Sequence, residues 1–216
     1  MNQSSELQIQ GVTVALGHRT LFGPVDAMIG PGECLTVMGP SGCGKSTLLA
    51  FLAGTLDPVF RARGRVRLGA ADLTQLPPER RHIGILFQDD LLFPHLSVGA
   101  NLAFALPGSV LPLAARRARI AQALADAGLE GFEDRDPATL SGGQRSRVAV
   151  MRTLLAEPLA LLLDEPFSKL DAQLRDDFRR FVFDHAKASR LPMLLVTHDA
   201  VDAQAAGGPV ILFDPT

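Results

Sequence analysis

Residues Cys34–Thr47, CLTVMGPSGCGKST, join a short apolar run to a glycine-rich loop. The apolar run, Cys34–Met38, is typical of a buried strand. The next residues, Gly39–Thr47, fit the pattern G-x-x-x-x-G-K-[ST], and a helix is predicted from Ser46 to about Ala53. Glycines let the backbone wrap closely around phosphate oxygens, so that successive N–H groups point at them. The order of strand, loop and helix therefore predicts a phosphate-binding loop.

The end of this loop carries a positive charge and a candidate metal ligand. We expect Lys45 to neutralise the β- and γ-phosphates of a nucleotide and the Ser46 hydroxyl to bind Mg²⁺. The helix that follows adds the positive end of its dipole. The predicted nucleotide contacts are Gly39, Pro40, Ser41, Gly42, Cys43, Gly44, Lys45, Ser46 and Thr47.

Two carboxylates follow a later apolar run, since Asp164 and Glu165 come directly after Leu161–Leu163. Ligands bind at the carboxyl ends of the strands in open parallel sheets. We expect Asp164 to hold Mg²⁺ through its water shell. Glu165 is the candidate base that takes a proton from the water attacking the γ-phosphate. In the absence of a phosphate-binding loop, the pair would be explained equally well as the cap of the next helix.

Two further polar residues stand at the ends of predicted strands. His198 comes just after Met193–Val196, and Gln88 follows Ile85–Phe87. Either side chain is placed to contact the γ-phosphate or the attacking water, and Gln88 is also a candidate Mg²⁺ ligand. The alternative for His198 is an ordinary structural histidine.

Apolar runs that alternate with helical patterns favour an α/β fold with a mainly parallel sheet. Buried strands are predicted at Ala160–Leu163 and Met193–Val196, in addition to the one before the loop. Between about residues 89 and 157 the pattern is helical instead. This interval is interpreted as a helical insertion and not as a separate domain.

The composition of the chain restricts the cellular compartment and the classes of binding partner that we expect. The chain has 216 residues, 47% of them hydrophobic, and a formal net charge of −2. No overall basic field attracts nucleic acid, and no apolar run approaches the roughly 20 residues that cross a bilayer. Cys34 and Cys43 are expected to be reduced thiols. We therefore expect a soluble chain in a reducing compartment, with no nucleic-acid partner.

A second glycine-rich stretch, LSGGQ at Leu140–Gln144, extends the pattern beyond a general phosphate-binding ATPase. Together with the other motifs, it makes the chain resemble the ATP-binding-cassette (ABC) ATPases over nearly its whole length. The six matching motifs, in chain order, are Walker A (Gly39–Thr47), the Q-loop (Gln88), the signature (Leu140–Gln144), Walker B (ending at Asp164 and Glu165), the D-loop (Ser168–Asp171) and the switch histidine (His198).

The resemblance implies a P-loop NTPase core with an N-terminal antiparallel β subdomain and an inserted α-helical subdomain at about 89–157. We expect a single domain over residues 1–216 without the C-terminal regulatory domain of many importer subunits, because the sequence ends 18 positions after His198. ATP and Mg²⁺ are the implied cofactors. The implied assembly is a head-to-tail homodimer, in which each ATP lies between the Walker A loop of one subunit and the signature of the other. The implied contacts across the dimer are Ser141, Gly142, Gly143, Gln144 and Asp171.

The segment Phe87–Val98 is similar to the equivalent stretch of prokaryotic importer subunits. The similarity implies transmembrane permease subunits as partners, a solute-binding protein as an indirect one, and a peripheral position on the cytoplasmic face of the inner membrane. Leu91, Leu92 and Phe93 are unusually apolar for a loop and suit a docking surface, although local packing would explain them too. Export or envelope remodelling remains the alternative to import. A DNA-repair ATPase is disfavoured, because the interval from Gln88 to Leu140 has no room for a long coiled coil.

The chain departs from the family pattern at the adenine site. Family members stack the base on an aromatic residue in the first strand region, where this chain has Leu16 and contains no Tyr or Trp. His18 and Phe22 are the nearby candidates for approaching the base. We therefore expect modest ATP affinity and poor discrimination against GTP.

Overall fold

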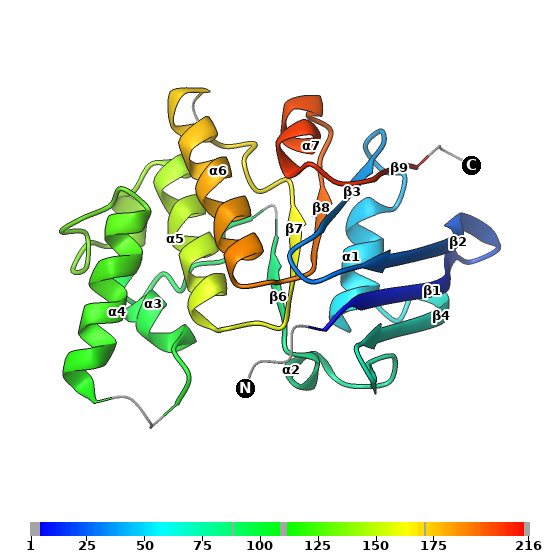
Figure 1. Ribbon diagram of the computed structural model, residues 1–216, viewed down its shortest axis with the longest axis horizontal. Helices are drawn as coiled ribbons and strands as arrows, with labels where there is room; N and C mark the ends of the chain where they lie inside the picture. The colour runs from blue at the N-terminus through cyan, green and yellow to red at the C-terminus, as the bar shows by residue number, and fades with distance from the viewer. Residues whose placement is uncertain (1–4, 88, 109–111, 171, 214–216) are drawn as a thin grey trace. The chain divides into compact units, whose positions relative to one another are not determined.

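The computed structural model describes residues 5–87, 89–108, 112–170 and 172–213, without the side chains of 172–174 (Figure 1). Gln88 and Asp171, two predicted contacts, lie outside these residues. The chain forms two compact units. The first comprises Met1–Ile85, Leu159–Glu165 and Phe183–Thr216, and the second Leu86–Pro158 and Pro166–Val182. Within the described residues, no helix combines the length and apolarity needed to cross a membrane.

An antiparallel sheet occupies the N-terminal part of the first unit, with strands in the order β2-β1-β4-β5. Its strands are β1 (Leu7–Leu16), β2 (Arg19–Ile29), β4 (Phe60–Leu68) and β5 (Ala71–Asp72). Leu7, Ile9, Val12 and Val14 are buried on one face of β1, with a register shift between Ile9 and Val12. The alternation gives the sheet one apolar face, which packs on the core of this unit.

The second sheet has the order β6-β7-β8-β3-β9, and its β3–β8, β3–β9 and β7–β8 pairings are all parallel. The strands are β3 (Cys34–Met38), β6 (Ile83–Leu86), β7 (Ala160–Asp164), β8 (Met193–Val196) and β9 (Val210–Leu212). Strands β7 and β8 are buried at every residue. Continuous apolar runs suit a parallel sheet covered on both faces, so the predicted α/β fold is confirmed.

Helix α1 (Lys45–Ala53) shares one hydrophobic core with both sheets. Leu48, Leu49 and Leu52 of α1 are almost inaccessible to solvent and belong to the same cluster as residues of β1, β3 and β8. The first unit also contains α2 (Pro78–Arg81) and α7 (Ala200–Ala206). The helix that begins at the phosphate-binding loop is therefore held along its length by the core.

The second unit is helical. It contains α3 (Val98–Ala105), α4 (Leu113–Asp126), the 3₁₀ turn η1 (Pro137–Thr139), α5 (Gly142–Leu155) and most of α6 (Ala172–Ala188). Helices α3, α4 and α5 contact one another. The predicted helical interval, 89–157, falls inside this unit. The sequence patterns did not predict that residues 166–182, which follow Glu165, group with it.

Arg81 fastens the carboxyl end of α1. Its guanidinium donates hydrogen bonds to the carbonyl oxygens of Phe51 (2.9 Å), Leu52 (2.8 Å), Thr74 (3.0 Å) and Leu76 (2.8 Å). Two of these carbonyls belong to the last turn of α1, where the helix supplies few donors; the Phe51 oxygen also accepts from the Gly54 N–H at 3.2 Å. The side chain is 5% exposed, and burial lowers its pKa. A single buried cation thus joins α1 to the segment after β5.

Replacing Arg81 with alanine should destabilise the chain by about 2–4 kcal/mol, because several buried carbonyls lose a charged donor at once. The measurement is the free energy of unfolding from urea titration. The control is Arg80→Ala, since Arg80 is the exposed neighbour, and its effect should stay within about 0.5 kcal/mol. Equal losses for the two variants would contradict this role of Arg81.

Candidate functional site

The phosphate-binding loop leaves the carboxyl end of β3 and enters α1. Gly44, at the start of α1, has φ +96°, and a Cβ there would lie 2.6 Å from Cδ1 of Phe22. Any other residue at this position would meet both backbone strain and a steric clash. The helix begins without a side-chain cap, so its first N–H groups have no side-chain partner. Such a helix start is suited to bind a phosphate group.

Lys45 points back into the loop. Its Nζ donates to the carbonyl oxygens of Gly39 and Pro40, each at 2.8 Å, and lies 3.9 Å from Sγ of Cys43. The side chain is only 7% exposed. The loop carbonyls therefore hold the ammonium group at the place where the glycine backbone curves, which is the predicted position for contact with phosphates.

The two predicted metal ligands of the described residues meet directly. The Ser46 hydroxyl is hydrogen-bonded to the Asp164 carboxylate at the end of β7. Burial raises the pKa of Asp164, with a further upward contribution from the charge of Glu165, while Ser46 and Lys45 act in the opposite direction. Among the described residues, no group of three or more acidic, histidine or cysteine side chains forms a closed metal cage. One carboxylate and one hydroxyl fit Mg²⁺, which usually keeps waters and binds phosphates as well.

Glu165 and His198 form a contact across two strand ends. His198 Nδ1 lies 3.0 Å from Oε1 of Glu165, and Glu165 is the less exposed partner, at 18% against 64%. A carboxylate oxygen accepts, so Nδ1 is the donor in this bond. The Glu165 N–H donates to the Val196 carbonyl oxygen at 2.9 Å, and Glu165 adopts φ +49°. A left-handed conformation at a non-glycine residue is frequent at functional sites, where surrounding contacts over-determine it.

The loop that carries His198 is fixed by Thr197, which the sequence patterns did not single out. Thr197 is 1% exposed, and its hydroxyl donates to Asp202 Oδ2 at 3.1 Å while accepting from the Asp199 N–H at 3.0 Å. Asp199 in turn caps α7 through the Val201 N–H. The sequence signal for Thr197 was a short polar residue directly after an apolar strand. Its hydrogen-bond partner, Asp202, lies five residues later and could be identified only from the structure.

The signature begins a helix in the second unit. Ser141 is the N-cap of α5: its hydroxyl accepts from the Gln144 N–H at 3.2 Å, and Gln144 Oε1 accepts from the Ser141 N–H at 2.9 Å. This capping box fixes the direction of the helix start. A Cβ on Gly143 would lie 3.2 Å from Leu170, so the D-loop segment packs closely against the signature.

Asp90 ties the segment after Gln88 to the signature helix. The Ser146 hydroxyl donates to Asp90 Oδ1 at 2.7 Å, and Arg145 Nε lies 3.6 Å from Asp90 Oδ2. Arg152 adds a bond to the Leu91 carbonyl oxygen at 2.9 Å. Sequence patterns did not identify this link, because the partners are separated by more than fifty residues in the chain.

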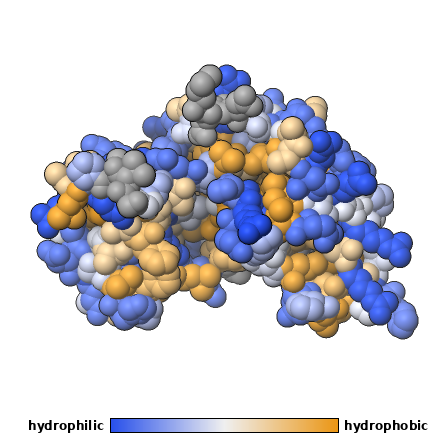
Figure 2. All heavy atoms as spheres, turned by 90° about the horizontal axis from the view of Figure 1, so that it is seen from below, coloured by the Kyte–Doolittle hydropathy of each residue, from blue (hydrophilic) through white to orange (hydrophobic). Residues whose placement is uncertain are grey.

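Within the predicted docking segment, the three apolar residues differ. The Phe93 ring packs at 4.8 Å from Phe104, and Arg152 lies over it at 5.3 Å. Leu92 is half-buried, whereas Leu91 is 58% exposed and adopts φ +45°. Apolar side chains reach the surface in several patches on the face drawn in Figure 2. Local packing therefore accounts for Phe93, while Leu91 remains on the surface.

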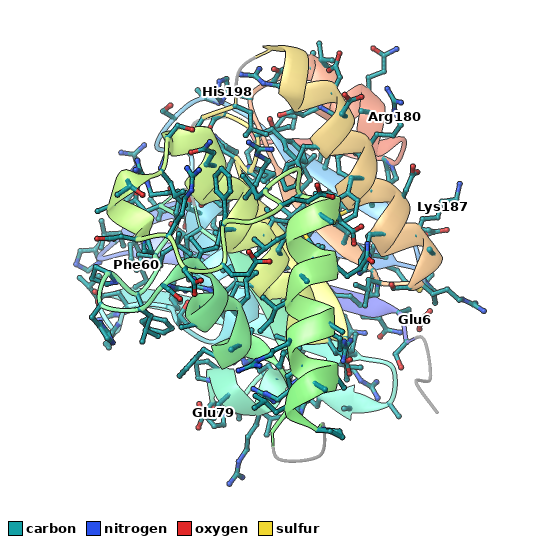
Figure 3. All side chains as sticks on the ribbon, turned by 90° about the vertical axis from the view of Figure 1, so that its left-hand side faces the viewer. Glu6, Phe60, Glu79, Arg180, Lys187 and His198 are labelled. Carbon is teal, nitrogen blue, oxygen red and sulfur yellow. The ribbon has the colours of Figure 1, made fainter. Side chains whose placement is uncertain are left out.

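The first unit holds the whole predicted phosphate-binding loop, Gly39–Thr47, together with Asp164, Glu165 and His198, the last labelled in Figure 3. The signature residues 141–144 belong to the second unit. The structure describes neither Gln88 nor Asp171, whose roles stay predictions.

Comparison with known proteins gives consistent matches. Residues 22–168 match the family described as ABC transporter. The Escherichia coli (strain K12) ABC transporter ATP-binding protein YnjD, itself uncharacterized, is 49% identical over 199 residues, which cover 92% of this chain and 91% of YnjD. The Fe(3+) ions import ATP-binding protein FbpC of the same strain is 38% identical over 214 residues, covering 99% of this chain and 61% of FbpC.

A solved structure matches as well. The ATP-binding cassette MJ0796, in a dimeric post-hydrolysis state bound to ADP and Pi, aligns with a TM-score of 0.84 and 28% sequence identity. The alignment covers 96% of this chain and 94% of MJ0796.

Replacing Thr197 with valine keeps the shape of the side chain but removes both hydrogen bonds of its hydroxyl. We expect the loop carrying His198 to loosen and the turnover number for ATP to fall roughly 10- to 100-fold. The assay is phosphate release at saturating ATP. Thr153→Val is the matched control, because the Thr153 hydroxyl bonds only to the helix carbonyl of Ala149 among the contacts described. An unchanged turnover number in Thr197→Val would exclude a positioning role.

Proposed function

The chain belongs to the ABC transporter family and is an ATP-binding, ATP-hydrolysing subunit, and from this premise we propose that it drives the import of a small solute through a separate membrane permease. The observation that carries the motor function is the Glu165–His198 contact beside the loop that holds Lys45.

Import is supported by the names of two relatives. These are FbpC, named for import of Fe(3+) ions, and the spermidine/putrescine import ATP-binding protein PotA of Bacillus anthracis, 35% identical over 208 residues. The chain spans 61% and 63% of the lengths of these two proteins. YnjD, which matches over nearly its full length, is not named for a solute. The direction and the solute are therefore parts of the proposal, and export or envelope remodelling is the alternative.

Binding of the triphosphate uses the uncapped start of α1. Its N–H groups and the curved glycine backbone would donate to the phosphate oxygens, and Lys45 would exchange its loop carbonyls for the β- and γ-phosphates. Mg²⁺, when bound, would neutralise the phosphate charge and act as a Lewis acid. Ser46 and Asp164, already in contact, are the residues that would hold it.

Hydrolysis would proceed by attack of water on the γ-phosphorus. A bond forms between the water oxygen and phosphorus, and the bond to the oxygen of the β-phosphate breaks, giving ADP and phosphate. Glu165 would accept the proton of the water, and His198, bonded to Oε1, would fix the direction of that carboxylate. Gln88 is proposed to sense the same phosphate.

The signature would act on the nucleotide of a second subunit in a head-to-tail dimer; a dimeric, ADP-bound state of MJ0796 supports an assembly of two subunits. Because the Ser141 hydroxyl accepts from Gln144, its hydrogen points elsewhere and can be donated to a phosphate oxygen. Gly142 and Gly143 would let that phosphate approach the helix start. Asp171 is proposed to complete the dimer contact.

Docking to the permease would use the surface around Leu91. The bonds of Asp90 to Ser146 and Arg145 would then connect the permease contact with the signature helix. The chain would lie peripherally on the cytoplasmic face of the membrane, and a solute-binding protein would act indirectly through the permease.

Replacing Glu165 with glutamine should lower the ATP turnover number at least about 100-fold, because an amide cannot accept the proton. ATP-induced dimers should persist, as the phosphate contacts are untouched. Phosphate release and size-exclusion chromatography with ATP measure the two properties. The control is Glu157→Gln, which removes only a surface ion pair with Arg119. Hydrolysis near the normal rate in Glu165→Gln would contradict the assignment of the base.

Leu91→Asp should weaken binding to the permease at least tenfold, because a charge replaces an exposed apolar contact. Aspartate tolerates the left-handed backbone at this position, so folding should be preserved. Co-purification with the co-expressed permease is the measurement. Leu212→Asp, at a residue 70% exposed in the first unit, is the control and should bind normally. Equal retention of both variants would remove Leu91 from the docking surface.

The direction of transport is tested with the co-purified permease in vesicles that carry the chain on their outer surface. Spermidine and Fe(3+), the solutes in the names of the relatives, are the first probes. ATP-dependent movement of a probe from the lumen toward the outer surface supports import. Movement into the lumen supports export.

A further inference from the structure

A hollow with a volume of about 290 Å³ lies beside the phosphate-binding loop. One part of its lining consists of loop and helix residues: Gly42, Gly44, Lys45, Ser46 and Thr47. The other part is formed by the apolar side chains of Leu16, Leu21 and Phe60. All of these residues belong to the first unit. A nucleotide with its phosphates on the loop would therefore extend its base toward the apolar side.

Strand register explains how Phe60 reaches this place. Phe60 is the first residue of β4 and pairs directly with Leu16, the last residue of β1. Directly opposed residues of an antiparallel pair project to the same face of the sheet. That face is the buried one, since Val66 of β4 and Val14 of β1 belong to the core. Leu16 and Phe60 are thus the end of the buried face, where it opens to solvent beside α1.

Both side chains remain accessible at this position. Leu16 is 43% exposed, and Phe60, labelled in Figure 3, is half-buried. Leu21 is the third apolar side chain of the lining, and Arg61 and Arg63, the next charged residues of β4, are exposed and absent from it. An apolar, partly open wall with one aromatic ring is suited to the flat face of a base.

We propose that Phe60 supplies the aromatic contact for the nucleotide base, with Leu16 beside it, in place of an aromatic residue at the end of β1. The assignment concerns how the nucleotide is recognised and does not depend on the direction of transport. It also changes one expectation from the sequence, because weak binding of the base is no longer expected.

The two alternatives considered from the sequence do not fit the geometry. Phe22 is 5% exposed and packs against Phe213 with the ring centroids 5.0 Å apart, so its ring is already part of the core. His18 is exposed in the turn between β1 and β2 and does not line the hollow. Phe60 is the aromatic residue that lines it.

The lining also predicts the selectivity. The apolar side of the hollow, Leu16, Leu21 and Phe60, offers no side-chain donor or acceptor to the edge of a base. Stacking tolerates any base, because every base has a π-face. Guanine and adenine nucleotides should therefore bind with affinities within a few-fold of each other.

The first test compares ADP with pyrophosphate by calorimetry. These ligands avoid the γ-phosphate, which is expected to bridge two subunits, and differ in the presence of the nucleoside. Phe60→Ala should weaken ADP binding roughly 5- to 100-fold and leave pyrophosphate binding unchanged. Phe60→Tyr should retain ADP affinity. The control is Phe104→Ala, at a residue 71% exposed in the second unit, which should leave both affinities unchanged.

The second test uses the absence of tryptophan from the chain. Phe60→Trp would provide the only indole fluorophore, at the proposed contact. ADP and GDP should change its emission strongly, and pyrophosphate should not, whereas the indole of Phe104→Trp should respond to none of the three. If Phe60→Ala does not fold, the fluorescence of Phe60→Trp still tests whether the base contacts position 60.

The outcomes separate the possibilities. Normal ADP affinity in Phe60→Ala, or equal losses for ADP and pyrophosphate, would overturn the assignment. An indole at position 60 that ignores ADP while ADP binds would overturn it as well. If the unsubstituted chain binds pyrophosphate but not ADP, the hollow does not receive a base at all. Failure of solute transport alone would affect the proposed import and leave the contact at Phe60 intact.

Discussion

Parallel pairing of β3, β7 and β8 holds Val37, Val196 and Asp164 at one level across three strands. The polar residues of the site in the first unit follow the carboxyl ends of these strands. The phosphate-binding loop continues from β3, Glu165 comes one residue after Asp164, and His198 comes two residues after Val196. Because the three strands point the same way, their continuations meet at one edge of the sheet. The backbone hydrogen bonds between these strands therefore position the polar side chains of the site relative to one another.

The two helices that begin at glycine-rich segments differ in how their N-termini are capped. Helix α1 has no side-chain cap, and Lys45 lies within its loop, so the helix start is suited to a ligand. Helix α5 is closed by the reciprocal Ser141–Gln144 cap, which fixes its direction before any ligand arrives. Under the proposed function, the first arrangement would enclose phosphates, and the second would present a rigid end to them. This difference agrees with one helix binding the nucleotide of its own subunit and the other completing the site of a partner.

Sequence patterns predicted the parts of the fold and site that depend on short intervals. The apolar runs before the loop and before Asp164 are continuous, so the sequence alone predicted that they are buried strands of a parallel sheet. Phe60 was missed because its proximity to Leu16 arises only from the pairing of β1 with β4. The bond between Asp90 and Ser146 was missed for the same reason, since it joins distant segments of the helical unit. Residues 166–182 were assigned to no unit, because nothing in their composition shows which core they join.

The position of β3 between β8 and β9 has a consequence for synthesis of the chain. Both neighbours of the strand that carries the phosphate-binding loop, Met193–Val196 and Val210–Leu212, are synthesised long after it. On the ribosome, β3 remains without these partners while about 150 residues are added, which takes roughly 8 to 30 seconds at ordinary elongation rates. Its apolar residues are exposed during that interval, so chaperone engagement of the nascent chain is expected around Cys34–Met38.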